Sequence, residues 1–260
     1  MNTIFCLAGI VVKELYRRKD FYVLFVITAV ITLIMSTVSF FHQAGIVRYL
    51  KDLCLLLIWI SSLVIAIVTT ARQIPAERES RTIFPLLAKP VSRWQVVAGK
   101  FTGCWLACGL ALAVFYLFFG AVCLAKEGHL ALAQYLQAFW LQWAMLAVVI
   151  SLALLGSVVF SAPSANATIC FTVVVGILVV GAYLQKLAAL QPPLTAWLLT
   201  LLYFAIPHLE WFYAVRERLI FDQDLIGWGD CALATAYAAA YAAVILCAAW
   251  LRFRRRPLTA

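Results

Sequence analysis

Six long apolar segments, separated by short polar connections, constrain the fold of this chain more than any other feature. They cover residues 21–41, 53–71, 101–125, 135–160, 167–184 and 230–251. A helix of about 20 apolar residues is long enough to cross the hydrocarbon core of a bilayer, which is about 30 Å thick. The whole chain is 66% hydrophobic, whereas a soluble domain is about 45–50% apolar. The sequence therefore predicts an all-α integral membrane protein with six transmembrane helices, in a single domain over residues 1–260.

The positive charges lie at the ends of these segments and predict an orientation. Four lysines and arginines precede residue 20, six lie between residues 72 and 100, and four follow residue 251, which places 14 of the 20 on the side of the N-terminus. Lysine and arginine are enriched in the cytoplasmic connections of membrane proteins. We therefore expect an even number of spans, with both termini cytoplasmic. The same distribution explains the net charge of +9, so this charge does not indicate nucleic-acid binding.

The N-terminal segment, residues 1–19, has the pattern of an amphipathic helix. Ile4, Leu7, Val11 and Leu15 fall on one helical face, whereas the basic residues fall elsewhere. This pattern is typical of a helix that lies at the membrane surface. A secretory signal is excluded because the charges follow the apolar part and no small-residue cleavage site comes after it.

Residues 185–229, between the last two apolar segments, contain a shorter apolar run. This run, residues 194–206, lies between Pro193 and Pro207 and has only 13 residues. It is too short to cross the bilayer and predicts a re-entrant or interfacial helix on the outer side. A seventh crossing here would also place the C-terminal arginines outside, against the charge distribution.

Small residues inside two of the segments predict close helix packing. In the third segment they are Gly103, Gly109 and Gly120. In the sixth they form two rows at a spacing of four residues: Ala232, Ala236 and Ala240, and Ala234, Ala238 and Ala242. Such residues let helix backbones approach one another in membranes.

The longest polar interruption, residues 72–100, looks too structured to be a plain loop. It holds six cationic residues against only Glu77 and Glu79. Good helix formers predict a helix over residues 77–87, which Pro90 ends because proline lacks an N–H. Ser92 is a suitable N-cap for a second helix that leads into the third apolar segment. A membrane protein with its charge concentrated on such an element is expected to contact a soluble partner there.

Motifs for catalysis and metal binding are missing from the sequence. It contains no P-loop, HExxH or GxSxG motif, and no Asp or Glu in the middle of an apolar segment for a proton relay. The eight cysteines form no CxxC pair and most lie in apolar runs. His42, His129 and His208 fall in predicted outer segments, where solvated histidines are the usual reading and a shared metal is the alternative. No cofactor is expected in this chain.

The polar hairpin resembles the signature of type-2 ABC exporter permeases. The resemblance is carried by ERESRT at 77–82, LL at 86–87, PVSR at 90–93 and GK at 99–100. Residues 13–22 also resemble the family's elbow helix, and Arg81 departs from a glycine that is frequent in the family. The run ERESRTIFPLLAKPVSRW and the segment IPHLEWF at 206–212 resemble a subgroup that includes the permease for nitrous-oxide-reductase maturation. A copper-related substrate is not carried over.

The resemblance implies that the first hairpin helix is a coupling helix seated on a separate ATPase subunit, which binds ATP and Mg. The implied ATPase contacts are Glu77, Arg78, Glu79, Arg81, Thr82, Leu86 and Leu87. Pro90 is implied to fix the break, and Arg93 and Lys100 to anchor the hairpin near anionic lipid. The alternative is that the charges, above all those of Arg72 and Lys100, serve only as topology signals.

The resemblance further implies a second permease subunit in a homodimer, with spans one and five at the seam, in a bacterial inner membrane. Trp211, Phe212 and Tyr213 are candidates for an outer gate, with interfacial anchoring as the alternative role. The first alternative function is an ABC-like subunit that transmits ATPase work to an envelope partner without moving a solute. A membrane enzyme or sensor is the second. The apolar spans are compatible with a lipid-like substrate, although lipid-facing surface also explains them.

Overall fold

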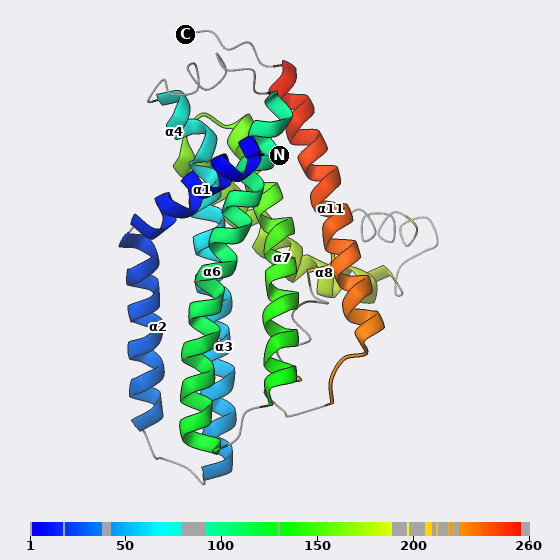
Figure 1. The fold of residues 1–260 in the computed structure, drawn as a ribbon. Helices are drawn as coiled ribbons and strands as arrows, with labels where there is room; N and C mark the ends of the chain where they lie inside the picture. The colour runs from blue at the N-terminus through cyan, green and yellow to red at the C-terminus, as the bar shows by residue number, and fades with distance from the viewer. Residues whose placement is uncertain are drawn as a thin grey trace.

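All regular structure in the described part of the chain is helical. The computed structural model describes residues 2–17, 19–37, 43–79, 92–128, 131–188, 197, 206–209, 212, 218, 220 and 224–255. Its helices are α1 (Asn2–Arg17), α2 (Lys19–Thr37), α3 (Gln43–Ala71), α4 (Gln73–Glu79), α6 (Arg93–Glu127), α7 (Leu132–Val159), α8 (Pro163–Ala188) and α11 (Trp228–Arg255). Figure 1 shows their arrangement. Within these residues the predicted all-α class is confirmed.

Four of these helical stretches are long and apolar enough to cross a membrane. They are Arg48–Glu79, Arg93–Lys126, Leu132–Val159 and Trp228–Arg255. The first and fifth predicted segments form the shorter apolar stretches Phe21–Ile34 in α2 and Pro163–Val179 in α8. Each of the six apolar segments therefore has most of its described residues in a helix, and a count of six spans stays a prediction.

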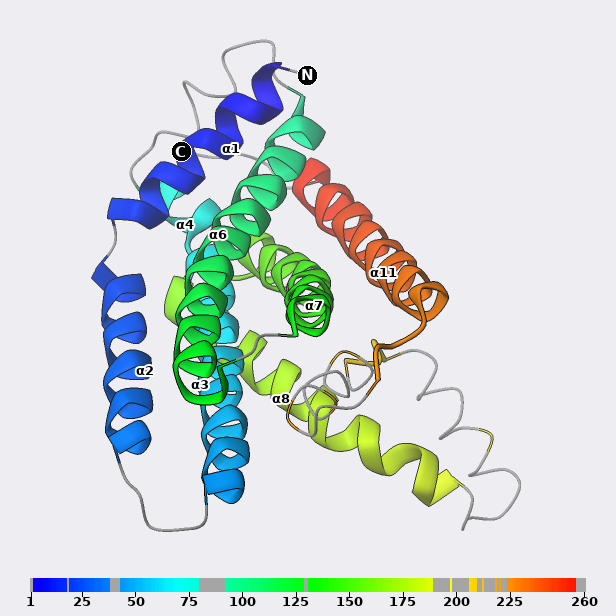
Figure 2. The same ribbon diagram turned by 60° about the horizontal axis from the view of Figure 1, so that its bottom comes forward.

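Three helices, α3, α6 and α7, pack together as the centre of the bundle, and the others surround them (Figures 1 and 2). α2 packs mainly on α3, α11 packs mainly on α7, and α8 runs obliquely against α3 and α7. α1, α4, the start of α6 and the end of α11 all lie at one end of the bundle. We call this the charged end, because the three arginines of the last turn of α11 lie there.

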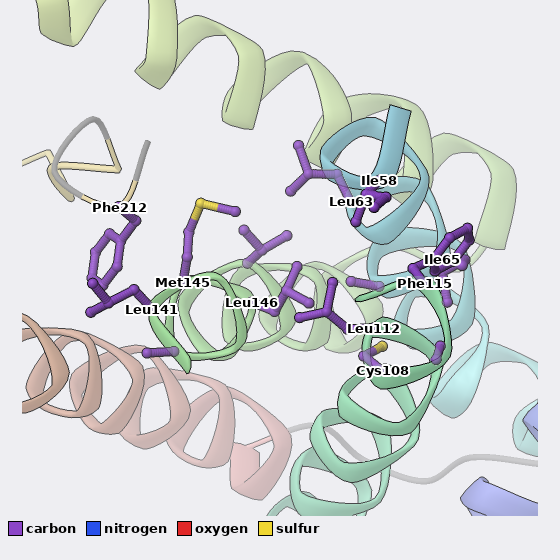
Figure 3. Close-up of a cluster of buried hydrophobic side chains, with 14 of the residues drawn as sticks. Ile58, Leu63, Ile65, Cys108, Leu112, Phe115, Leu141, Met145, Leu146 and Phe212 are labelled. Atoms are coloured by element: carbon purple, nitrogen blue, oxygen red, sulfur yellow. The ribbon is translucent and has the colours of Figure 1, made fainter. Parts of the chain in front are cut away.

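Apolar side chains from the three central helices form the core (Figure 3). Ile58 of α3, Leu112 and Phe115 of α6, and Met145 and Leu146 of α7 are at most 1% exposed. Lipid tails are as apolar as these side chains, so hydrophobic transfer adds little inside a bilayer. Close packing, with many small dispersion contacts, therefore has to hold these helices together.

Glycines of α6 allow two close contacts, as the sequence predicted. A Cβ atom at Gly103 would lie 2.8 Å from Cβ of Val11 in α1, and one at Gly109 would lie 2.5 Å from Nε1 of Trp143 in α7. Beside Gly109, the rings of Trp105 and Trp143 stack with centroids 4.3 Å apart. Each indole N–H donates to the other residue's carbonyl oxygen at 3.0 Å. This reciprocal pair fixes α6 against α7.

The N-terminal helix packs on protein with the face predicted to be apolar. Leu7 and Val11 are buried, at 7% and 0% exposure, against α6. Phe5 and Ile10, by contrast, are 65% and 56% exposed. α1 thus has apolar side chains on two sides, and the predicted position of this helix at the membrane surface stays a prediction.

The alanine rows of α11 behave differently from each other. Ala238 and Ala242 of one row are buried against the bundle, as predicted. Ala232, Ala236 and Ala240 of the other row are exposed. The prediction of tight packing for this second row is wrong within the chain, because the helix faces its neighbours with only one side.

Candidate functional site at the charged end

A buried ion pair joins α4 to α6. Lys100 is 3% exposed, and its Nζ lies 2.6 Å from Oε1 of Glu77. Nζ also donates to Oε1 of Gln73 at 3.0 Å. Burying an unpaired ammonium group costs several kcal/mol, and these two oxygens compensate that cost. Lys100 was expected near anionic lipid, and the structure instead places it in the protein interior.

The same cluster extends to α1 through Gln73. Its amide Nε2 donates to Oε2 of Glu14 and to the backbone carbonyl of Thr69, both at 3.4 Å. Gln73 is 3% exposed, so its amide has little access to water. We call Glu14, Gln73, Glu77 and Lys100 the ionic cluster. It connects three elements that are far apart in the sequence: the N-terminal helix, α4 and the start of α6.

The direction of α4 is set by a break after α3. The helical pattern is interrupted at Arg72 and resumes at Gln73. Pro75 has no N–H to donate to the carbonyl of Ala71, four residues earlier, so that acceptor loses its helical partner. Nδ2 of Asn166, in α8, lies 3.5 Å from this carbonyl oxygen and replaces the missing donor.

Asn166 also ties this break to α7. The residue is fully buried, and Nδ2 donates to the carbonyl oxygen of Ala153 at 3.1 Å. A Cβ atom at position 156 would lie 2.0 Å from Oδ1 of Asn166, so Gly156 is required for this approach. The base of α4 is therefore held by α7 and α8 as well as by α6.

Arg93 connects the start of α6 to the end of α11. Its Nη1 donates to the carbonyl oxygens of Phe253 at 2.7 Å and Arg254 at 2.9 Å. Its guanidinium carbon lies 5.6 Å from the ring centroid of Phe253. The last carbonyls of a helix lack intrahelical partners and carry partial negative charge, so a cation is favourable there. Arg93 thus attaches the start of α6 to α11, and its role as a lipid anchor stays a prediction.

The predicted N-cap of α6 is confirmed. The Ser92 side chain accepts a hydrogen bond from the backbone N–H of Gln95 at 3.3 Å, and the Gln95 side chain accepts from the Ser92 N–H at 2.9 Å. This reciprocal arrangement is a capping box. It fixes the point at which the hairpin re-enters a long apolar helix.

The predicted ATPase-contacting residues are only partly within the described chain. Glu77 and Arg78 are half-buried and Glu79 is exposed, all in α4. The helix α4 begins at Gln73, before the predicted start at residue 77, because the proline is accepted in its first turn. Residues 80–87 of the predicted helix lie outside the described residues. The other members lie outside the described residues: Arg81, Thr82, Leu86, Leu87 and the break residue Pro90.

The outer-gate prediction fares differently. Trp211 and Tyr213 lie outside the described residues. Phe212 is 5% exposed and belongs to the main apolar core, near Leu141 in Figure 3. The gate role of these three residues stays a prediction.

A hydrogen-bonded network inside the bundle was missed at the level of sequence. The Tyr116 hydroxyl donates to Oε1 of Gln142 at 2.8 Å, and Nε2 of Gln142 donates to Oγ of Ser62 at 2.9 Å. Thr28 and Ser61 meet at 3.3 Å on another side of α3. Isolated polar residues within the apolar runs are the sequence signal for such a network. The search for polar groups inside the spans was restricted to Asp and Glu, so these residues were not identified.

No group of three metal-ligating side chains occurs among the residues that the structure describes. His208, expected in a solvated loop, is instead buried at 7% exposure. Its Nδ1 lies 2.8 Å from the Tyr237 hydroxyl, which also accepts from the His208 backbone N–H at 3.0 Å. This histidine therefore helps to attach residues 206–209 to α11.

The comparison with protein families agrees with this architecture. Residues 10–258 match the model of the family described as ABC-2 family transporter protein. The comparison with individual curated proteins gave no significant match. Since the match covers nearly the whole chain and the helices are long and apolar, the chain is a multi-pass membrane protein that belongs to the ABC-2 transporter family, as a permease component.

Proposed function

We propose that this chain is the permease subunit of an ATP-driven exporter, and that a separate ABC ATPase binds Mg-ATP and hydrolyses it. The observation that carries the proposal is the buried pair of Glu77 and Lys100. It joins the segment with the family's coupling-helix signature to a helix long enough to span the membrane. A displacement of that segment would therefore be transmitted to α6 through this ion pair.

The route from α4 has three branches. Lys100 passes displacement of α4 to α6, and Gln73 passes it to α1 through Glu14. Asn166 links the end of α3 to α7 and α8. Arg93 makes α11 follow the start of α6. In the proposed cycle, ATP-driven closure of two ATPases moves two coupling helices together, and each bundle responds as a unit.

The working unit in this proposal is a homodimer with six spans per copy and both termini cytoplasmic, in a bacterial inner membrane. The exposed apolar faces of α2 and α8 support a seam between spans one and five. They include Val26, Val30 and Ile34 in α2, and Phe171 and Val175 in α8. The 14 to 6 distribution of cationic residues, counted from the sequence, supports the orientation.

The substrate class that fits best is lipid-like or amphipathic. The centre of a single copy is filled by apolar side chains, and the buried amide of Gln142 is bonded to its neighbours. A path at the seam between copies suits an apolar substrate. The alternative is a subunit of the same assembly that transmits work to an envelope partner. Membership of the nitrous-oxide-reductase maturation subgroup stays a resemblance.

Co-purification with a candidate ABC ATPase tests the docking step. Glu79→Arg reverses an exposed charge of α4 and is expected to abolish both the complex and its ATP hydrolysis. Lys13→Glu reverses an exposed charge of α1 and is the matched control. An intact complex with Glu79→Arg rejects docking at this residue, and failure of the native chain to bind any ATPase rejects the exporter function.

The transmission step needs a different readout. Lys100→Met is expected to leave the complex intact, because the residue is 3% exposed and does not itself form part of the docking surface. It is expected to uncouple ATP hydrolysis from substrate stimulation, because it loses the bond to Glu77. The double variant with Glu77→Leu removes the stranded carboxylate. Its free energy of unfolding, compared with that of Lys100→Met, shows how much of the effect of Lys100→Met is lost folding. Normal stimulation in Lys100→Met contradicts the proposed route.

A further inference from the structure

An apolar groove runs along the face where α11 crosses α6 and α7. Two hollows of about 430 and 800 Å³ make up this groove, and they share part of their lining. Its α6 and α7 side carries Trp94, Trp105, Trp140 and Trp143, and its α11 side carries Ala239 and Ala243. We call it the Trp–Ala groove. Each hollow by itself is within the range of small-molecule sites, which are about 300–1,000 Å³.

The chemistry of the groove selects an apolar occupant. The indole N–H groups of Trp105 and Trp143 are used by the reciprocal backbone bonds. Trp140 donates to the Thr235 hydroxyl at 3.0 Å. These three tryptophans therefore present ring faces and edges, and the alanine methyl groups opposite leave the space that larger side chains would fill.

The smaller hollow of the groove is about as long as one leaflet of a bilayer. The smaller hollow is lined along α11 from Thr235 to Leu246. Eleven residues of α-helix rise about 16 Å, which is about half of the 30 Å hydrocarbon core. One acyl chain of a lipid in the leaflet at the charged end has this reach.

The mouth of the groove at the charged end is cationic. Trp94, which lines the groove, contacts Trp250 edge to face at 6.2 Å, and the Arg254 guanidinium lies 5.8 Å from the Trp250 ring centroid. Arg252 and Arg255 in the same helical turn are exposed. The planar guanidinium group of arginine can form two parallel hydrogen bonds to a phosphate group. Basic residues beside a membrane span also attract anionic lipids.

We infer that the Trp–Ala groove holds an acyl chain of an anionic phospholipid, whose headgroup phosphate contacts the arginines at the end of α11. A second copy of the chain is a poorer occupant, because a symmetric pair would bring two arginine clusters of the same sign together at one end. This inference depends on the groove and its charges alone and goes beyond the transport function proposed above.

Quenching of tryptophan fluorescence by brominated acyl chains tests the inference, because bromine quenches only on contact. The full-length protein is reconstituted in vesicles of phosphatidylcholine that contain brominated phosphatidylglycerol or, at the same mole fraction, brominated phosphatidylcholine. We expect several-fold stronger apparent binding of the anionic lipid. Ala239→Leu with Ala243→Leu fills the groove and should abolish that preference.

Matched controls separate the groove from general effects. Ala240→Leu with Ala248→Leu adds the same bulk to exposed positions of α11 outside the groove lining and should leave the preference intact. Arg252→Gln with Arg254→Gln should remove it, whereas Lys13→Gln with Arg17→Gln, on exposed side chains of α1, should not.

Three results would overturn the inference. Equal quenching by both lipids would mean a non-selective lipid annulus. A preference that survives filling of the groove would place the anionic lipid elsewhere. Quenching that is absent in the native assembly but appears when copies are separated by dilution would show that a second copy covers the groove. Loss of ATPase binding or transport has no bearing on these readouts, so the two proposals fail separately.

Discussion

α7 and α11 have nearly the same sequence signal and different surroundings. Both helices have 28 residues, and their best windows have mean hydropathies of 2.1 and 1.9. Yet 72% of the α7 window is buried in the structure, whereas only 22% of the α11 window is. Hydropathy therefore identifies both as membrane helices, but it does not distinguish a central helix from a peripheral one.

The difference follows from how many neighbours each helix has. α7 packs on α3, α6, α8 and α11, whereas α11 packs mainly on α7 and to a smaller extent on α6. The buried side chains of α11 form one stripe that includes Ala238, Ala242 and Ala249. The rest of its surface is left for lipid or for other subunits, and it forms one wall of the Trp–Ala groove.

The largest contrast between the two helices is expected from truncation of their apolar side chains. Leu146→Ala in α7 removes a fully buried side chain and should lower the free energy of unfolding by about 2–5 kcal/mol. Val244→Ala in α11, at a residue that is 69% exposed, should change it by less than about 0.5 kcal/mol. Reversible unfolding in mixed micelles measures both, and equal losses would refute the burial contrast.

The ionic cluster should give the next largest effect. Lys100→Met leaves the Glu77 carboxylate without its buried cation. Removing one partner of a buried pair costs about 3–5 kcal/mol, and we expect the lower end because the Glu77 side chain is 22% exposed. Adding Glu77→Leu should restore most of the lost free energy of unfolding. A double variant no more stable than the single one would show that the charge pair is not the cause.

Loss of the buried Asn166 of α8 should lower the free energy of unfolding by less than loss of Lys100. Asn166→Ala leaves the carbonyl of Ala71 without its side-chain donor, at an expected cost of about 1–3 kcal/mol. Thr168→Ala, at an exposed position of the same helix, is the control and should be nearly neutral. Hydrogen exchange of α4 is the sharper measurement, since release of this link should speed exchange there. Unchanged exchange in α4 would mean that Asn166 does not hold the break.

Interhelical hydrogen bonds should give the smallest effects. Gln142→Leu removes bonds to Tyr116 and Ser62, and Thr235→Val removes the acceptor of the Trp140 N–H at the surface. Such bonds average about 0.6 kcal/mol in membranes, with a maximum near 1.7. We expect Gln142→Leu to cost more than Thr235→Val in the same unfolding assay. The reverse order would mean that burial does not strengthen these bonds.

Features with a local cause could be predicted from the sequence. Ser92 and Gln95 form the N-terminus of α6 as expected, because a capping box involves only neighbouring residues. Gly103 and Gly109 were identified as points of close approach, because only glycine lacks the Cβ that would collide there. The signature in residues 77–100 predicted an ABC permease of the ABC-2 family, and the match to that family's model confirms the family.

Features that depend on partners distant in the sequence could not be predicted. Lys100 looked like a topology signal, and its burial depends on Glu77 and Gln73, which α3 and the break at Pro75 bring beside it. Arg93 finds its partners 160 residues later, at the end of α11. Phe212 carried an aromatic signal that fits a gate, an anchor or a core residue equally well.

The sequence by itself determined that this protein is a helical membrane protein and where its apolar helices lie, because backbone polar groups must be paired within the helix in a bilayer. Only the tertiary structure decided which helix is central, which alanine row is covered and which cation is buried. The physical reason is that lipid tails and apolar side chains are equally good neighbours for an apolar helix. Its environment is therefore set by the shapes and polar groups of the other helices.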